Sequence, residues 1–233
     1  MKLLVLAAAV AAAVPATAAN LAINGDFSAG NSGFTSTYTY APSSPTAGLP
    51  EGVYLVDTNA ANVHPSWYSF GDHTTGSGQY LIVNGATSTV AGEGRTAWQQ
   101  TVAGSANTKY FFEAFAANIC CNSSFTGPIA PSNLTFTVDD GTTETVLSTF
   151  TTNPAKSGQW VGLSSSYTST LGGPLTLRIV NSNLAASGND FAVDDINFST
   201  STTVTEAATW TMLVAGFGLV GAATRRRVRT VAA

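Results

Sequence analysis

Few side chains in this 233-residue chain have the chemistry of a catalyst. The chain has two histidines, His64 and His73, and it contains no nucleophile-elbow, zinc-protease or phosphate-loop motif. Two pairs of adjacent acids, Asp139-Asp140 and Asp194-Asp195, have the residue type that glycosidases use. Neighbouring residues of a strand point to opposite faces, so neither pair could flank one glycosidic bond. We therefore expect no enzymatic activity.

Acids that stand beside expected core segments indicate a cation instead. They are Asp26, Asp72, Asp194 and Asp195. Carboxylates that gather at the edge of a core repel one another unless a cation neutralises them. Ca²⁺ takes six to eight oxygen ligands, several of them from carboxylates. The pattern predicts a structural calcium ion, and the alternative is that these acids are ordinary turn and strand-end residues.

Aromatic side chains could supply flat surfaces that stack on sugar rings. Trp67 and Tyr68 follow Pro65 in an expected loop, so we predict that these two form a ligand-binding platform. Trp98 and Trp160 adjoin expected strands and are expected in the core.

The two cysteines, Cys120 and Cys121, are adjacent. Their Cα atoms would lie about 3.8 Å apart, below the usual range for a disulfide. Cysteines of exported proteins usually form disulfides. Two free thiols or bridges between chains are the alternatives. We predict a vicinal disulfide that closes a surface turn.

The segment that must position these residues has the periodicity of strands. Apolar residues alternate with polar ones along 134–138 and 175–179, and the alternation changes face across Asp194-Asp195. Asp139-Asp140-Gly141 is typical of a hairpin turn. No ten-residue amphipathic helix is visible between 20 and 199. About eight to eleven short strands favour an all-β sandwich, above all a jelly roll.

Three stretches carry a resemblance. "NLAINGDFSAGNSGF" begins at Asn20, "GDHTTGSGQYLIVNG" at Gly71 and "GNDFAVDDINF" at Gly188. Together they resemble the galactose-binding-like jelly rolls, a group that includes many carbohydrate-binding modules and the MAM adhesion domains. The resemblance implies a calcium ion that joins the first strand region to the last. Its ligands would be Asp26, Asp72 and one of the paired acids, and we favour Asp194.

The first 19 residues are typical of a secretory signal peptide. A lysine is followed by an apolar run from Leu3 to Val14 and then by Ala16-Thr17-Ala18. The run is too short to span a bilayer comfortably, so an uncleaved anchor is the weaker alternative. The expected jelly-roll ectodomain covers 20–199, and a polar linker covers 200–206.

The C-terminal tail, 207–229, is expected to cross a membrane. Residues 207–224 carry no charge and would extend about 27 Å as a helix, close to the hydrocarbon thickness of a bilayer. The arginines that follow predict that the C-terminus lies in the cytoplasm. A buried helix of the soluble domain is the alternative. The tail resembles the PEP-CTERM sorting signal in its PEPxA form, through Glu206, Trp210 and the cluster Arg225, Arg226 and Arg227. Both prolines of the motif are absent here.

Net charge and the two termini suggest where the protein acts. Four basic and twelve acidic residues between 20 and 204 leave a charge of −8, which argues against a nucleic-acid partner. The tail implies an exosortase-type processing enzyme, the inner membrane and a periplasmic or cell-surface location. We predict a non-catalytic surface protein that binds extracellular polysaccharide. The alternative is a structural or adhesive protein of the envelope or biofilm matrix that binds no glycan.

Overall fold

The computed structural model describes residues 19–45, 48–87 and 96–200. The predicted signal peptide and the predicted tail, with Glu206, Trp210 and the arginine cluster 225–227, lie outside the described residues. Among those described, no helix has the length and apolar character needed to cross a membrane. Residues 19–200 form one compact unit.

The described residues are almost entirely strand and loop. They form ten strands and two short 3₁₀ helices: β1 (Thr39–Tyr40), β2 (Val53–Asp57), η1 (Ala60–Asn62), β3 (Tyr80–Val83), β4 (Thr96–Gly104), β5 (Thr108–Asn118), β6 (Asn133–Asp139), β7 (Glu144–Thr151), η2 (Pro154–Lys156), β8 (Val161–Ser169), β9 (Gly173–Asn181) and β10 (Phe191–Ser199).

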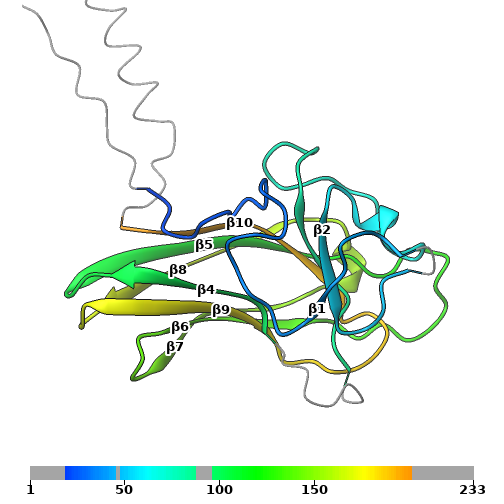
Figure 1. Ribbon diagram of the computed structural model, residues 1–233. Coiled ribbons are helices and arrows are strands. Elements are labelled where there is room, and N and C mark those ends of the chain that lie inside the picture. The colour runs from blue at the N-terminus through cyan, green and yellow to red at the C-terminus, as the bar shows by residue number, and fades with distance from the viewer. Residues whose placement is uncertain (1–18, 46–47, 88–95, 201–233) are drawn as a thin grey trace, which may run out of the picture. The chain divides into compact units, whose positions relative to one another are not determined.

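The strands form two sheets that pack face to face (Figure 1). The six-stranded sheet has the order β1-β2-β3-β10-β5-β8, and the four-stranded sheet has the order β4-β9-β6-β7. From β3 onward the pairs are nested: β3 pairs with β10, β4 with β9, β5 with β8 and β6 with β7. This nesting is the strand order of a jelly roll. It confirms the predicted all-β sandwich.

The alternation seen in the sequence is the burial pattern of the sheets. Leu134, Phe136 and Val138 of β6 point into the core, and so do Leu175, Leu177 and Ile179 of β9, together with Trp98. The intervening residues of both strands point outward because successive side chains of a strand face opposite ways. A second apolar cluster lies apart from this main core and contains Trp67, Cys120 and Cys121.

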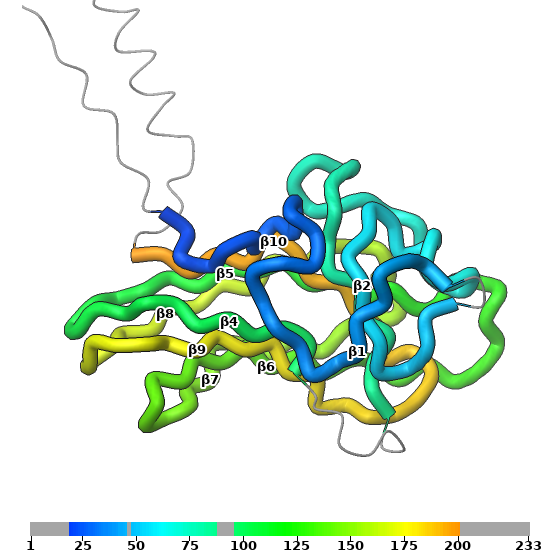
Figure 2. The backbone as a smooth tube through the Cα atoms, viewed as in Figure 1, coloured from blue at the N-terminus to red at the C-terminus, as the bar shows by residue number. Residues whose placement is uncertain are grey.

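The N-terminal segment runs beside β10, as Figure 2 shows in blue and orange. Leu21 donates its N–H to Phe198 O over 2.8 Å, and Ile196 donates to Gly25 O over 2.9 Å. A Cβ on Gly25 would collide with the Ile196 carbonyl, so this close approach requires glycine. The predicted change of face in β10 is confirmed by a register shift between Asp194 and Asn197. The two ends of the domain therefore meet, as the resemblance implied.

Candidate binding site

The loop from Gly71 to Gln79 is held in shape by Asp72. Its carboxylate accepts hydrogen bonds from the N–H of Thr75 (3.0 Å), the Thr75 hydroxyl (2.9 Å) and the N–H of Gly78 (2.7 Å). Burial alone would raise the pKa of Asp72, but these hydrogen bonds outweigh it and hold the pKa below its usual value. The loop thus has an ionised acid at its centre, although that side chain is buried.

The same loop is attached to β10 by the two adjacent aspartates. His73 donates its backbone N–H to Asp194 Oδ2 over 2.8 Å, and its Nδ1 lies 2.7 Å from Asp195 Oδ2. The hydroxyl of Thr74 also donates to Asp195 Oδ2. Burial, followed by the charge of Asp195, raises the pKa of Asp194 to about 7. Asp194 is 1% exposed, so its carboxyl group holds the backbone of the loop from the interior of the domain.

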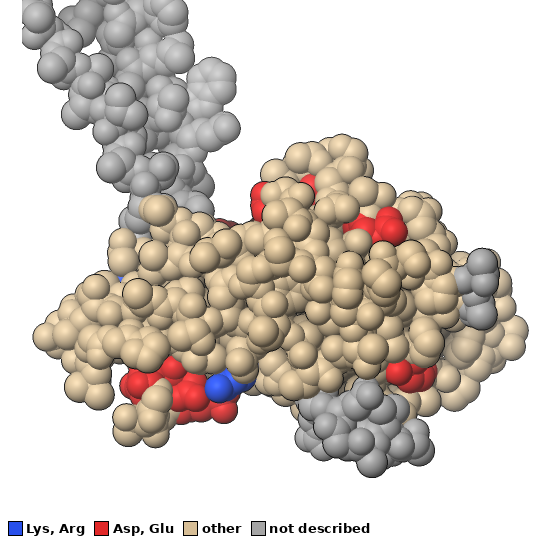
Figure 3. Space-filling model, viewed as in Figure 1, with Lys and Arg blue, Asp and Glu red and all other residues tan. Residues whose placement is uncertain are grey.

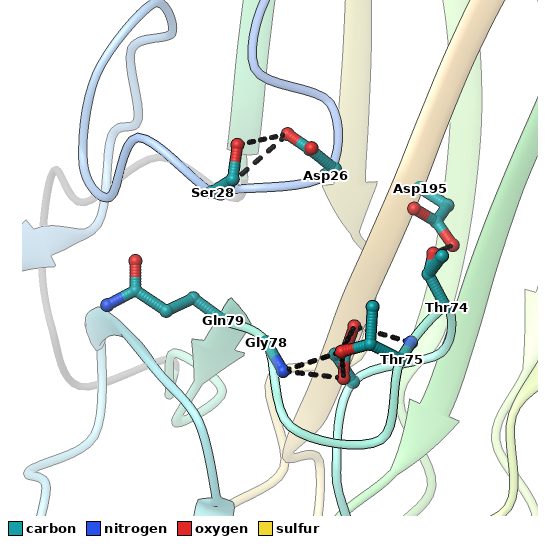
Figure 4. A pocket seen from close by; sticks show the side chains of 8 residues that line it. Asp26, Ser28, Thr74, Thr75, Gly78, Gln79 and Asp195 are labelled. Carbon is teal, nitrogen blue, oxygen red and sulfur yellow. Dashed lines mark hydrogen bonds between the residues drawn. The ribbon is translucent and has the colours of Figure 1, made fainter.

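An acidic pocket of about 350 Å³ opens between this loop, the N-terminal segment and β10 (Figure 4). We use the name acidic pocket for the site that is lined by Asp26, Ser28, Asp72, Thr74, Thr75, Gly78, Gln79 and Asp195. In Figure 4, Asp26 and Ser28 lie on one side of it and Gln79 and the loop on the others. Carboxylate, hydroxyl and amide side chains therefore line the pocket from different sides.

Aromatic rings border the acidic pocket. The ring of His73 stacks on that of Phe115, with centroids 3.4 Å apart and planes at 15°. The half-buried Trp160 packs edge-on against His73 at 6.3 Å and donates its Nε1–H to Gly71 O over 3.0 Å. We call Phe115, His73 and Trp160 the aromatic border. Only His73 belongs to the loop that forms the pocket; Phe115 lies in β5 and Trp160 directly precedes β8. The bond between His73 and Asp195 is what joins these rings to the pocket.

The structure corrects the predicted platform. Trp67 is only 3% exposed, and its Nε1–H donates to the buried carboxylate of Asp190 over 3.1 Å. Its ring therefore cannot stack on a sugar, and the prediction is wrong for Trp67. Tyr68 is 37% exposed but does not line the acidic pocket. Its binding role stays a prediction.

Cys120 and Cys121 are joined by a disulfide in the structure. Both are buried, at 4% and 7% exposure, and pack in the same cluster as Trp67. The expected surface location is therefore wrong, because the pair belongs to a core.

The predicted calcium ligands are only partly assembled. Asp26, Asp72 and Asp195 line the acidic pocket, whereas Asp194 is buried and does not line it. Both oxygens of Asp72 already accept hydrogen bonds from the loop. Across residues 19–45, 48–87 and 96–200, no three His, Cys, Asp or Glu side chains are grouped as metal ligands. The described arrangement therefore does not fit a ready calcium clamp, and calcium stays a sequence prediction.

Sequence reasoning missed part of this site. Thr74 and Gln79 belong to the loop that the D-H-T pattern marks, so their place near Asp72 had a local signal. Phe115 had a weaker signal in the sequence. It lies with Phe111 and Glu113 on the half-buried face of β5, and the opposite face is buried. The sequence does not show that β5 lies against the loop, so the contact between Phe115 and His73 could not be predicted.

No protein-family model matches the chain, and no curated protein matches it. Several solved structures of carbohydrate-binding modules are similar. TmCBM61 in complex with β-1,4-galactotriose has 13% identity and a TM-score of 0.48, over 78% of this chain and 99% of that one. The tandem CBM22-1 and CBM22-2 modules of Paenibacillus barcinonensis Xyn10C have 16% identity and a TM-score of 0.46, over 83% and 50%. A family 16 carbohydrate-binding module has 16% identity and a TM-score of 0.42, over 77% and 99%.

At these identities the similarity concerns the fold alone, and the jelly-roll assignment rests on the strand order itself. This chain spans half the length of the tandem modules that it matches. The resemblance of the tail to a sorting signal stays a sequence prediction.

Proposed function

We propose that this domain is a non-catalytic module that binds a polysaccharide or other glycan at the acidic pocket and the aromatic border. The observation that carries the proposal is the contact between the two surfaces: His73 stacks on Phe115 and also bonds Asp195 of the pocket. Sugars present both hydroxyl groups and apolar ring faces. Binding sites for such ligands combine apolar walls with a few placed polar groups.

The pocket's polar groups suit hydroxyl donors. The acidic pocket has carboxylates from Asp26 and Asp195, an amide from Gln79 and a hydroxyl from Ser28. Carboxylates accept charge-assisted hydrogen bonds, which are about twice as strong as neutral ones. Within the described residues, no histidine nitrogen bonds a serine hydroxyl as an activated nucleophile would require: His64 accepts the backbone N–H of Ser66, and His73 pairs with Asp195. The proposal therefore assigns binding, and no reaction, to this site.

Gln79→Ala tests the pocket directly. Its side chain lines the pocket and makes no hydrogen bond within the described residues, so its removal should leave the fold intact. We expect polysaccharide affinity to fall about three- to tenfold, the effect of one lost hydrogen bond. Gln159→Ala is the matched control, because Gln159 is exposed and does not line the pocket; it should bind like the parent. The measurement is retention on immobilised polysaccharides, followed by titration of the best ligand. Equal loss in both variants, or none in Gln79→Ala, would contradict the site.

We also propose that the chain is exported by its first 19 residues and anchored in the inner membrane by its tail, before any processing by an exosortase-type enzyme. The proposal is supported by the charge pattern of the sequence alone. From there the domain would face the periplasm and could be released to the cell surface. We also propose calcium at Asp26, Asp72 and Asp194 or Asp195; Ca²⁺ should then raise the melting temperature of the protein above its value in a chelator, and equal melting temperatures would contradict the proposal.

Reporter fusions test the anchor. A reporter that is active only in the periplasm, fused after Ala233, should be inactive, because the arginines hold this end in the cytoplasm. The same reporter fused after Thr200, with the tail deleted, should be active. An active fusion at Ala233 would mean that the tail is translocated and does not anchor the chain.

A further inference from the structure

The strand β8 is a sheet edge that is paired on one side only. It ends the six-stranded sheet and pairs along all nine of its residues with β5, in one register from Val161 with Ala116 to Ser169 with Thr108. Within the described residues, no other backbone segment donates to it or accepts from it. An edge strand points alternate N–H and C=O groups away from the sheet. β8 therefore presents a row of backbone groups that could pair with another strand.

The other three edges of the two sheets are protected. The edge strand β1 is only two residues long, and β4 is covered by the chain before β1 through the bridge between Thr35 and Gln99. β7 has a register shift, and its first residue, Glu144, pairs with Arg178; Figure 3 shows acidic and basic side chains together over this hairpin. Short strands, covering segments, bulges and charges all block pairing at sheet edges. β8 has no charged residue, no proline and no register shift.

Exposed apolar side chains mark both ends of β8. Val161, its first residue, is 36% exposed, and Leu171, just after its end, is 56% exposed. When two copies of β8 pair antiparallel about Ser165, Val161 of one copy lies diagonally across from Leu171 of the other. Diagonal neighbours across two strands are within reach of each other's side chains. The same pairing sets Leu163 opposite Tyr167 and brings no two charges of β8 together. The edge is therefore complementary to a second copy of itself.

We propose that two copies of the chain pair antiparallel through β8 and join their six-stranded sheets across a two-fold axis. A contact of this kind uses the same edge twice, so the backbone donors of each copy meet acceptors of the other. A strand of another protein is the competing occupant. The second copy is favoured because it brings an uncharged, uninterrupted strand of equal length with an apolar residue at each end. Since the other edges are protected, the assembly closes at two copies.

The pairing would place two copies of the proposed glycan site on one face. Phe115 of the aromatic border is paired with Gly162 of β8, and a Cβ on that glycine would lie 3.0 Å from the Phe115 ring. The ring therefore lies over the edge strand. Strands about 4.8 Å apart with a rise of about 3.3 Å per residue would separate the two Phe115 residues by about 25 Å. This consequence rests on the proposed function, whereas the pairing itself does not.

The test measures the mass of the full chain in a neutral detergent by sedimentation equilibrium, between about 1 and 200 µM. We expect the protein mass to rise from one chain to two, with a micromolar dissociation constant, as for other small interfaces. Ser164→Lys with Ser166→Lys sets lysine opposite lysine across the axis and should weaken the dimer about tenfold or more. Both serines are exposed in the single chain, so its fold should survive. Thr101→Lys with Ala103→Lys adds the same charge to exposed positions of β4 and should dimerise like the parent.

Four outcomes would overturn the pairing. A chain that stays monomeric at about 200 µM would leave a strand of another protein as the occupant of the edge. A dimer that the lysines on β8 do not weaken must form through another part of the chain. Equal weakening by the lysines on β4 would reduce the effect to net charge, and assemblies larger than two chains would contradict the two-fold axis.

A glycan experiment tests the shared face separately. A long polysaccharide should be retained more strongly by the parent than by the variant with lysines on β8, because two linked sites bind with avidity. A short oligosaccharide should bind both equally. Equal retention of the long polysaccharide would contradict the shared face, and no retention of any glycan would overturn the proposed function; in both cases the dimer measured by sedimentation would stand.

Discussion

Trp67→Ala should lower the free energy of unfolding by about 3–5 kcal/mol, the cost of truncating a buried aromatic side chain. The ring is 3% exposed and packs in the cluster that contains Cys120, Cys121 and Ile119. For a domain of this size the melting temperature should fall by about 10 °C or more. Thermal unfolding followed by circular dichroism measures the change. Tyr68→Ala, at a position 37% exposed, is the control and should shift the melt by much less.

Trp67→Phe separates the hydrogen bond from the ring. It keeps most of the apolar volume but removes the N–H that reaches Asp190 Oδ2 over 3.1 Å. The buried carboxylate would then keep only the N–H of Gly85, at 3.1 Å, as a donor. Burial raises the pKa of Asp190 to about 7, so this hydrogen bond has a charged partner only above that pH. Trp67→Phe should therefore cost about 1 kcal/mol at pH 5 and about 1.5–3 kcal/mol at pH 8. A native melting temperature in Trp67→Ala, together with lost glycan retention, would restore the predicted platform and remove Trp67 from the core.

The fold was predictable because the strands obey a local rule. In β6, apolar residues alternate with threonines, and this alternation indicates that Leu134, Phe136 and Val138 face the core. The Asp194-Asp195 step was readable for the same reason: two polar residues in succession break a period of two, and the structure has a bulge there. The nesting of the strands was not readable from alternation alone. It came from the resemblance of the first, loop and closing segments to one class of jelly roll.

The site was predictable only in part, because burial is not a local property. Trp67 lies in a loop after Pro65, and loops usually run over the surface. Here that loop packs against Cys120 and Phe125, which are more than fifty residues away in the sequence. The indole of Trp67 donates to Asp190, directly before β10. Asp190 was not singled out, since nothing local marks it as buried. Asp26, Asp72 and Asp195 were found because the resembled class places its first and last segments side by side, and the structure does so.

The stability of the domain should fall as pH rises from about 4 to 8, and Asp190 is the main reason. Burial raises its pKa to about 7, and the charge of Glu51 adds to this, although the hydrogen bonds from Gly85 and Trp67 act in the opposite direction. In the unfolded chain the pKa returns to about 3.9. Between these two values the folded state keeps a proton that the unfolded state has lost, so each step up in pH favours unfolding. Asp194, with its pKa also raised to about 7, acts with the same sign.

Between its unfolded pKa of about 3.9 and its folded pKa of about 7, one buried aspartate changes the free energy of unfolding by about 4 kcal/mol. One pKa unit corresponds to about 1.4 kcal/mol. Burial lowers the pKa of His64, which reduces stability as pH falls below about 6.5 and so opposes part of the trend. Because both aspartates outweigh a single partly buried histidine, the melting temperature at pH 5 should exceed that at pH 8 by about 8 °C or more. Asp190→Asn should remove about half of this dependence, because Asp194 remains, whereas Asp57→Asn should leave it unchanged. Thermal melts at half-unit steps of pH give the slope directly. A melting temperature that rises between pH 4 and 8, or a pH dependence that Asp190→Asn leaves unchanged, would contradict this prediction. It would mean that Asp190 is ionised in the folded protein and that Trp67 and Gly85 compensate its charge.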